Sequence, residues 1–139
     1  MIVVDTNVVA ELMRPEPHEV VQCWSLALQS DDSYTTAITL AEILYGIERL
    51  PSGRRKDLLR TTARDVFATF GDRVLPFDAG AAAHYTLVVE GRDRLGRPID
   101  GFDAQIASIC RLGGAALATR NVKAFEHTGI EVIDPWHTQ

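Results

Sequence analysis

Hydrophobic residues along the chain form two kinds of pattern, short β-branched runs and longer stretches with helical spacing. The run Ile2-Val3-Val4 is too short for a helix and does not alternate with polar residues, so it predicts a buried strand. Between residues 40 and 50 the apolar side chains recur at i, i+3, i+4 and i+7, which predicts an amphipathic helix. The chain read in this way has strands at 2–4, 34–36, 74–77, 115–119 and 131–133, and helices at 8–13, 17–27, 40–50, 54–70, 79–90, 100–112 and 122–126.

The predicted strands and helices alternate along the whole chain, with no internal repeat and no linker. A polar loop is expected at 91–98, before the helix that starts near Asp100. This alternation predicts an α/β sandwich with a mostly parallel central sheet, in one domain that spans 1–139. In such sheets ligands bind beyond the carboxyl ends of the strands. Functional side chains are therefore expected just after each strand.

Composition narrows the class of protein. At 139 residues, with 46% hydrophobic and 24% charged residues, the chain resembles an ordinary globular domain. Cys23 and Cys110 stand among apolar residues without CxxC spacing, so buried, reduced thiols are expected. The sequence has no apolar stretch of about 18 residues and no basic leader, which predicts a cytoplasmic protein without a membrane partner.

The net charge of −5 argues weakly against a nucleic-acid ligand, because such ligands usually bind a basic surface. A metal ion would however neutralise some of the carboxylates, and the basic residues are clustered. The clusters are 54–56, the arginines at 92, 94 and 97, and the pair Arg120 and Lys123. Each cluster is either a contact for a phosphate backbone or an ordinary solvated surface.

Asp5 and Glu42 each come after a predicted strand. Asp5 is either the N-cap of the next helix or a ligand, and Thr6 or Asn7 could supply the cap instead. Glu42 lies among apolar residues, and Thr39-x-x-Glu42 fits a capping box. A carboxylate in that environment is expected to be partly buried and to need a cation or a donor. Cap and ligand therefore both remain possible roles for Glu42.

Asp103 and Asn121 stand in similar places further along the chain. Asp100 has the position of an N-cap, and Asp103 falls in the first helical turn, where the helix dipole favours a carboxylate. Two aspartates so close together repel each other unless one faces a cation, so we interpret Asp100 as the cap and Asp103 as a ligand, although the two could exchange roles. Asn121 either caps the short helix after it or offers an oxygen to a hard metal.

These residues together predict a site built from oxygen ligands at the carboxyl edge of the sheet. Such ligands suit Mg²⁺ or Mn²⁺ rather than zinc. The four histidines form no HxxxH or HExxH pair and are expected at the surface. The sequence also has no GxSxG, GxGxxG or Walker A motif.

Four blocks of the sequence resemble the PIN-domain family, particularly the VapC- and FitB-type toxins of bacterial toxin–antitoxin pairs. They are Ile2-Val-Val-Asp5-Thr-Asn-Val, Ile38-Thr-Leu-Ala-Glu42-Ile-Leu-Tyr-Gly46, Pro98-Ile-x-x-x-Asp103-Ala-x-Ile-Ala107 and Leu117-Ala-Thr-Arg-Asn121-x-x-x-Phe125. The blocks occur in the family's order. With the closing segment 129–136 they cover essentially the whole chain.

The resemblance implies a compact three-layer α/β/α domain, usually a homodimer, that cuts RNA with a divalent metal, Mg²⁺ or Mn²⁺. Asp5, Glu42 and Asp103 would hold the metal, with Asn121 at the fourth catalytic position. The resemblance also implies an antitoxin that wraps the toxin, lays a segment across the acidic pocket and carries the domain that binds operator DNA. Two departures make the pocket less negative and bear on a second metal: Asn121 stands where aspartate is common, and Ala124 where many relatives have an acidic residue.

The chemistry expected from this set is hydrolysis of an RNA phosphodiester by metal-activated water. Asp5 and Asp103 would be primary ligands and Glu42 a ligand or water-orienting base, while Thr6 would hydrogen-bond a carboxylate or the phosphate. A receiver-like phosphoacceptor domain is one rival, but it would need an acidic pair after the first strand, where Asp5 is followed by Thr6. The other rival is a non-catalytic PIN-like module that only binds its antitoxin and repressor partner.

Overall fold

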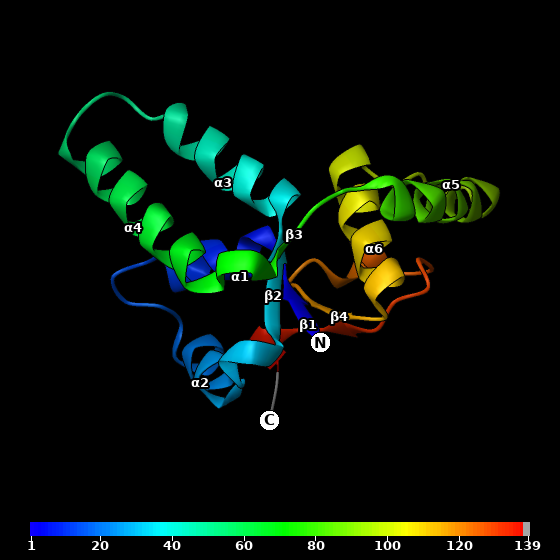
Figure 1. Ribbon diagram of the computed structural model, residues 1–139, viewed down its shortest axis with the longest axis horizontal. Helices are drawn as coiled ribbons and strands as arrows, with labels where there is room; N and C mark the ends of the chain where they lie inside the picture. The colour runs from blue at the N-terminus through cyan, green and yellow to red at the C-terminus, as the bar shows by residue number, and fades with distance from the viewer. Residues whose placement is uncertain (138–139) are drawn as a thin grey trace.

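A five-stranded parallel sheet runs through the centre of the computed structural model, which describes residues 1–137 (Figure 1). The strand order is β3-β2-β1-β4-β5, and each neighbouring pair is parallel. The strands are β1 Ile2–Val4, β2 Ser33–Thr36, β3 Val74–Leu75, β4 Ala116–Ala118 and β5 Val132–Ile133. The predicted parallel α/β architecture is confirmed.

Helices cover the sheet on two sides, which gives the three layers expected of the resemblance (Figure 1). In Figure 1, α3 and α4 lie on one side, and α5 and α6 lie on the other. The helices are α1 Thr6–Leu12, α2 Glu19–Ala27, α3 Ala37–Glu48, α4 Arg54–Phe70, α5 Ala79–Arg94 and α6 Gly101–Gly113. Short 3₁₀ turns are η1 Ser30–Asp32, η2 Gly71–Arg73, η3 Val122–Phe125 and η4 Pro135–His137.

Each face of the sheet carries its own apolar cluster, because successive strand residues point to opposite faces. Val3 is buried with residues of α5, α6 and η3, whereas the next residue, Val4, is buried with residues of α1, α3 and α4. Strand β4 repeats the alternation, since Leu117 belongs to the first cluster and Ala118 to the second. Full burial of one such valine contributes about 1.5–3 kcal/mol. The central strands thus tie both helical layers to one sheet.

The order of the strands reverses between β1 and β4. The chain goes outward from β1 to β2 and β3, and then returns to place β4 on the other side of β1. Such a switch point opens a crevice beyond the strand ends, where α/β proteins bind their ligands. The N–H of Asp5 donates to the carbonyl of Ala118 at 2.9 Å, so the residues after β1 and β4 meet at this point.

Helix α5 is longer than the sequence predicts, and the loop expected at 91–98 is wrong for residues 91–94. The error comes from Arg92, which looks like a surface residue in the sequence but is only 6% exposed. Its guanidinium donates to the carbonyls of Arg97 and Ala124, both at 2.7 Å, and of Glu126 at 3.1 Å. These bonds hold the last turn of α5 in helical form.

Strand β3 is shorter than expected, with two residues in place of 74–77. Pro76 has no N–H to donate to a neighbouring strand, so the pairing ends before it. Helix α6 ends at Gly113, one residue later than expected, and Gly114 with φ 63° closes it in the left-handed conformation.

Two expectations about single residue types are half right. Cys110 is fully buried, and burial raises the pKa of its thiol to about 12, but Cys23 is exposed on α2. Cys23 points to solvent because its neighbour Trp24 takes the inward position. His18, His127 and His137 are exposed as predicted, whereas His84 is half-buried, with an Nδ1 that finds no hydrogen-bond partner among residues 1–137. No helix in this part of the chain is long and apolar enough to cross a membrane.

Candidate active site

Asp5 lies where β1 ends, and it is only 4% exposed. It is the N-cap of α1, since its Oδ1 accepts from the N–H of Thr6 at 2.8 Å. The other oxygen, Oδ2, accepts from the hydroxyl of Thr119 at 2.8 Å and from the amide of Asn7 at 3.4 Å. The idea that Thr6 or Asn7 caps the helix instead is therefore wrong. Asp5 caps with one oxygen and turns the other toward the residues after β4.

Thr119, the residue that follows β4, is the centre of a small polar network. Its hydroxyl donates to Asp5 and accepts from the side-chain amide of Asn7 at 3.0 Å and the N–H of Asn121 at 3.1 Å. Asn7 in turn accepts from the N–H of Arg120 at 3.0 Å. The sequence signal for this role is a polar residue directly after a buried strand, but the partners Asp5 and Asn7 lie more than one hundred residues away in the chain and could not be predicted from it.

Glu42 is half-buried in the first half of α3, and the capping-box explanation for it is wrong. The N-cap of α3 is Thr36, whose hydroxyl accepts from the N–H of Thr39 at 3.0 Å. The carboxylate of Glu42 instead accepts, through Oε1, from the hydroxyl of Thr6 at 2.7 Å. The expected hydrogen bond between Thr6 and a carboxylate is thereby confirmed.

Asp100 has the capping role that its position indicates. Asp100 is the N-cap of α6, and its Oδ2 accepts from the N–H groups of Phe102 at 3.1 Å and Asp103 at 3.4 Å. The carboxylate of Asp103 is half-buried and accepts no hydrogen bond from any residue in 1–137. Asn121 is exposed at the N-cap position of η3, but its side chain makes no capping bond there.

The carboxyl groups of Asp5, Glu42 and Asp103 all have raised pKa values, and burial is the largest cause for each. At Asp5 the hydrogen bonds from Thr119 and Thr6 oppose the effect of burial. At Asp103 the negative charges of Asp5, Asp100 and Glu42 add to it and raise the pKa to about 6, against a smaller opposite effect of Arg92. The negative charges of Asp5 and Asp100 also raise the pKa of Glu42. The carboxylates therefore lie near enough to repel one another.

Comparison with known proteins identifies the family of this chain. The family model described as "PIN domain" matches residues 2–131. The chain belongs to the PIN-domain family. It is 35% identical over 137 residues to "VapC ribonuclease Y4jK" of Sinorhizobium fredii, with 98% of both chains covered. It is also 35% identical over 138 residues to "Toxin FitB" of Neisseria gonorrhoeae, with 99% of both chains covered.

Solved structures agree with this assignment. The crystal structure of FitAcB from Neisseria gonorrhoeae has a chain that matches this PIN domain with a TM-score of 0.93 and 34% identity, over 99% of this chain and 100% of that one. DNA-bound VapBC from Salmonella typhimurium matches with a TM-score of 0.74 and 26% identity, over 96% of this chain and 97% of that one. The resemblance stated from the four sequence blocks is confirmed.

The donor set of this PIN domain fits a hard divalent cation in its chemistry. Carboxylate oxygens are the ligands that Mg²⁺ and Mn²⁺ prefer, and a cation would remove the repulsion that raises the pKa of Asp103. Within residues 1–137, no three His, Cys, Asp or Glu side chains are arranged so that they could hold a metal ion as they stand. The carboxylates thus lie near enough to act on one another's pKa values without converging on one point, as expected for like charges.

The basic clusters differ from one another in the structure. Arg92 is buried against backbone carbonyls, so it is neither a phosphate contact nor a solvated residue. Lys56 is also buried, with its Nζ 2.9 Å from the carbonyl of Glu48. Arg120 is exposed next to Asn121, with its guanidinium 5.0 Å from the centre of the Trp136 ring. Arg120 is thus an exposed basic residue that directly follows Thr119, whose hydroxyl donates to Asp5.

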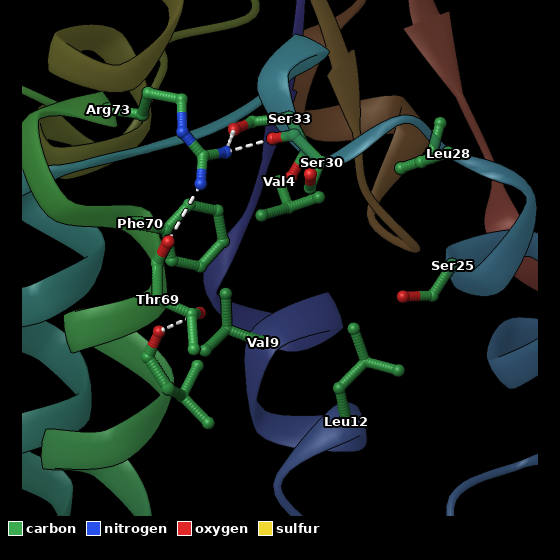
Figure 2. A pocket seen from close by; sticks show the side chains of 11 residues that line it. Val4, Val9, Leu12, Ser25, Leu28, Ser30, Ser33, Thr69, Phe70 and Arg73 are labelled. Atoms are coloured by element: carbon green, nitrogen blue, oxygen red, sulfur yellow. Dashed lines mark hydrogen bonds between the residues drawn. The ribbon is translucent and has the colours of Figure 1, made fainter.

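Two hollows lie on the side of the sheet covered by α1 and α4. A groove of about 460 Å³ runs past Glu42 and is lined mostly by apolar residues, with Arg14 and Arg55 among them. A smaller hollow of about 260 Å³ contains none of the four predicted site residues. Figure 2 shows its rim, where the guanidinium of Arg73 donates to the carbonyls of Ser30, Ser33 and Thr69. Of these two hollows in the described part of the chain, the larger one includes a predicted site residue, Glu42.

Proposed function

We propose that this chain is a metal-dependent endoribonuclease and the toxin of a toxin–antitoxin pair. One observation carries the proposal: carboxylates from three separate parts of the sequence lie near the switch point of the sheet, where the charge of Asp5 raises the pKa values of both Glu42 and Asp103. The fold does not need this arrangement, since repulsion among buried charges destabilises the protein. The names of the relatives, a VapC ribonuclease and the toxin FitB, supply the class of reaction.

Asp5 and Asp103 are the ligands of the metal in this proposal, with Glu42 as a further ligand or the group that orients the attacking water. Mg²⁺ or Mn²⁺ bound there would make water a better nucleophile at neutral pH and stabilise charge on the phosphoryl oxygens. Asp5 is held in place by the hydroxyl of Thr119 and the N–H of Thr6. Asn121 lies at the edge of the site and steers a water or the substrate.

Asp103 is the residue that responds most to a cation. With a pKa near 6 it is partly protonated in mild acid and ionised at neutral pH. Its carboxylate accepts no hydrogen bond within the described residues, so it is free to turn toward a cation. The site would thus become complete when a metal binds, rather than before.

RNA is the substrate, and it would approach with its backbone near Arg120, outside the acidic crevice. An antitoxin would bind the apolar groove beside Glu42 and reach across the carboxylates. The solved complexes FitAcB and VapBC support a protein partner of this kind. Binding to operator DNA would come through the antitoxin alone, and we expect the toxin to be a homodimer that acts in the cytoplasm.

Cleavage of a mixed panel of structured RNAs by the purified chain, with Mg²⁺, with Mn²⁺ and with EDTA, tests the proposal. We expect cleavage with either metal and none with EDTA. Asp5→Asn is the matched control, because an amide keeps the shape of the side chain and loses its charge. Cleavage in EDTA, or equal cleavage by the Asp5→Asn variant, would contradict the site. No cleavage under any condition would favour a module that only binds its partner.

A further inference from the structure

A chain of threonine hydroxyls leads from the buried end of β2 to the carboxylate of Glu42. Thr36 Oγ1 lies 3.3 Å from Thr39 Oγ1, and both of these residues are fully buried. Thr39 Oγ1 lies 3.2 Å from Thr6 Oγ1. The last link, from Thr6 Oγ1 to Glu42 Oε1, is the shortest at 2.7 Å. Three hydroxyls, from the end of β2, the first turn of α3 and the start of α1, therefore lead to one carboxylate oxygen.

The protons of these hydroxyls point in one direction. A hydroxyl has a single proton, and an ionised carboxylate can only accept. The Thr6 proton therefore goes to Glu42, since a hydrogen bond to a charged carboxylate is stronger than one to a neutral hydroxyl. Thr6 can then accept the proton of Thr39, which can accept that of Thr36. Hydrogen bonds aligned in this way polarise one another, so Glu42 receives a stronger donor than an isolated threonine would give.

Thr6 touches two of the predicted metal ligands at once. Its N–H donates to Asp5 Oδ1 at 2.8 Å, and its hydroxyl donates to Glu42 Oε1. The second oxygen of Glu42, Oε2, takes part in no hydrogen bond with residues 1–137. One residue thus fixes the positions of two carboxylates and leaves one oxygen of Glu42 unoccupied by protein donors.

The fold gives no reason to hold Glu42 in this way. The N-cap of α3 is Thr36, so Glu42 does not cap the helix. Burial and the nearby charges of Asp5 and Asp100 oppose its ionised form, so a charge at this position destabilises the folded protein. A neutral hydroxyl orients the carboxylate without cancelling its charge, which an arginine or lysine partner would do.

We infer that Thr6 is a positioning residue of the nuclease site, whose hydroxyl holds Glu42 by Oε1 and keeps Oε2 available to the metal or the attacking water. This inference rests on the proposed function. It adds Thr6, which follows Asp5 in the first of the four sequence blocks, to the residues that the chemistry requires. It also assigns the contact with the metal or the attacking water to one oxygen of Glu42, Oε2.

The test compares Thr6→Val, which removes the hydroxyl at nearly constant shape, with Thr6→Ser, which keeps it. We expect Thr6→Val to lower kcat by about 10-fold to 100-fold, the factor that corresponds to a lost hydrogen bond to a charged group. KM for RNA should stay within about 2-fold, and Thr6→Ser should recover most of kcat. Thr61→Val is the control, because Thr61 is exposed on α4 and its hydroxyl only bonds the carbonyl of Asp57.

A double-mutant cycle separates positioning from a general structural effect. In a Glu42→Gln background, Thr6→Val should change kcat by less than about 2-fold, because the group that Thr6 positions has already lost its charge. The same loss in both backgrounds would overturn the inference. So would equal kcat in Thr6→Val and the wild type, or equal loss in Thr6→Val and Thr6→Ser.

Binding of Mn²⁺ to the protein alone, measured by calorimetry, keeps this inference distinct from the proposed function. Thr6→Val should weaken Mn²⁺ binding while Thr6→Ser and Thr61→Val leave it unchanged. If the wild type cleaves no RNA, the proposed function fails, and weaker Mn²⁺ binding by Thr6→Val would still support the positioning role. Equal Mn²⁺ binding by the wild type and Thr6→Val, or no binding by either, would overturn it.

Discussion

The two sides of the site are built in different ways. On the β1 side, Asp5 is buried at a strand end, and both of its oxygens accept hydrogen bonds. On the α6 side, Asp103 lies in the first turn of a helix, and its carboxylate accepts none from the described residues. The first of these proposed ligands, Asp5, is held in place by the fold. The second is left with an unfavourable charge that a cation would relieve, and this difference indicates which part of the site responds to metal.

The largest effect on RNA cleavage should come from removing the carboxylate charge of Asp5 or of Asp103. We expect Asp5→Asn and Asp103→Asn each to lower the rate of RNA cleavage by on the order of 100-fold or more, since both are proposed ligands and removal of one electrostatic group commonly has this effect. Single-turnover rates with Mg²⁺ measure it. The two sides should differ in stability, because Asp5→Asn disturbs a hydrogen-bonded cap and Asp103→Asn does not. Equal destabilisation by the two substitutions would remove the contrast between them.

Thr119→Val tests how firmly the β1 side is preformed. The substitution removes the main donor to Asp5 Oδ2. It also leaves the side-chain amide of Asn7 and the backbone N–H of Asn121 without their shared acceptor. We expect the free energy of unfolding to fall by about 2 kcal/mol, the usual result of leaving buried polar groups unpaired. Urea denaturation measures the change, and Thr119→Ser should behave like the wild type. An unchanged midpoint in Thr119→Val would show that Asp5 is held by other contacts.

Addition of a divalent ion tests the α6 side of the site, where Asp103 lies. At a Mn²⁺ concentration ten times the dissociation constant, binding to the folded state alone stabilises the protein by about 1.4 kcal/mol. We expect a corresponding rise in Tm in the wild type and little or none in Asp103→Asn. Mn²⁺-free buffer with added NaCl at equal ionic strength is the control for simple screening. The same rise in both proteins would place the ion elsewhere.

The smallest effect is the pH dependence of Asp103. Its pKa in the folded protein, about 6, lies above the ordinary value of 3.8, so its ionisation opposes folding. This destabilisation is absent below pH 3.8, grows as the pH rises to about 6 and is complete above that. In EDTA, Asp103→Asn should therefore be more stable than the wild type by roughly 1 kcal/mol at pH 7.5, after allowance for solvent screening, and by much less at pH 4.5. Urea unfolding at both pH values measures the difference in stability between the variant and the wild type. A larger gain at pH 4.5 than at pH 7.5 would contradict the predicted pH dependence.

Hydrophobic patterning predicted the fold well, because each face of a strand or helix must bury its own apolar side chains. The parallel sheet, the helices on both sides and the roles of Asp100 as cap and Asp103 as a carboxylate without a capping role follow from local sequence alone. The errors came where a side chain's partner is distant in the sequence. Arg92 looked like a loop residue because two of the three carbonyls that keep it buried, those of Ala124 and Glu126, lie more than thirty residues away in the chain.

The site divides in the same way. The sequence by itself determined which residues follow the strands, and hence that Asp5 and Glu42 come after β1 and β2 at the carboxyl edge of the sheet. The tertiary structure decided what each one contacts. The Thr39-x-x-Glu42 spacing suggested a cap, yet Glu42 turns to Thr6, thirty-six residues earlier in the chain. Spacing along the chain sets only local geometry, whereas the packing of α1 against α3 brings the hydroxyl and the carboxylate into contact.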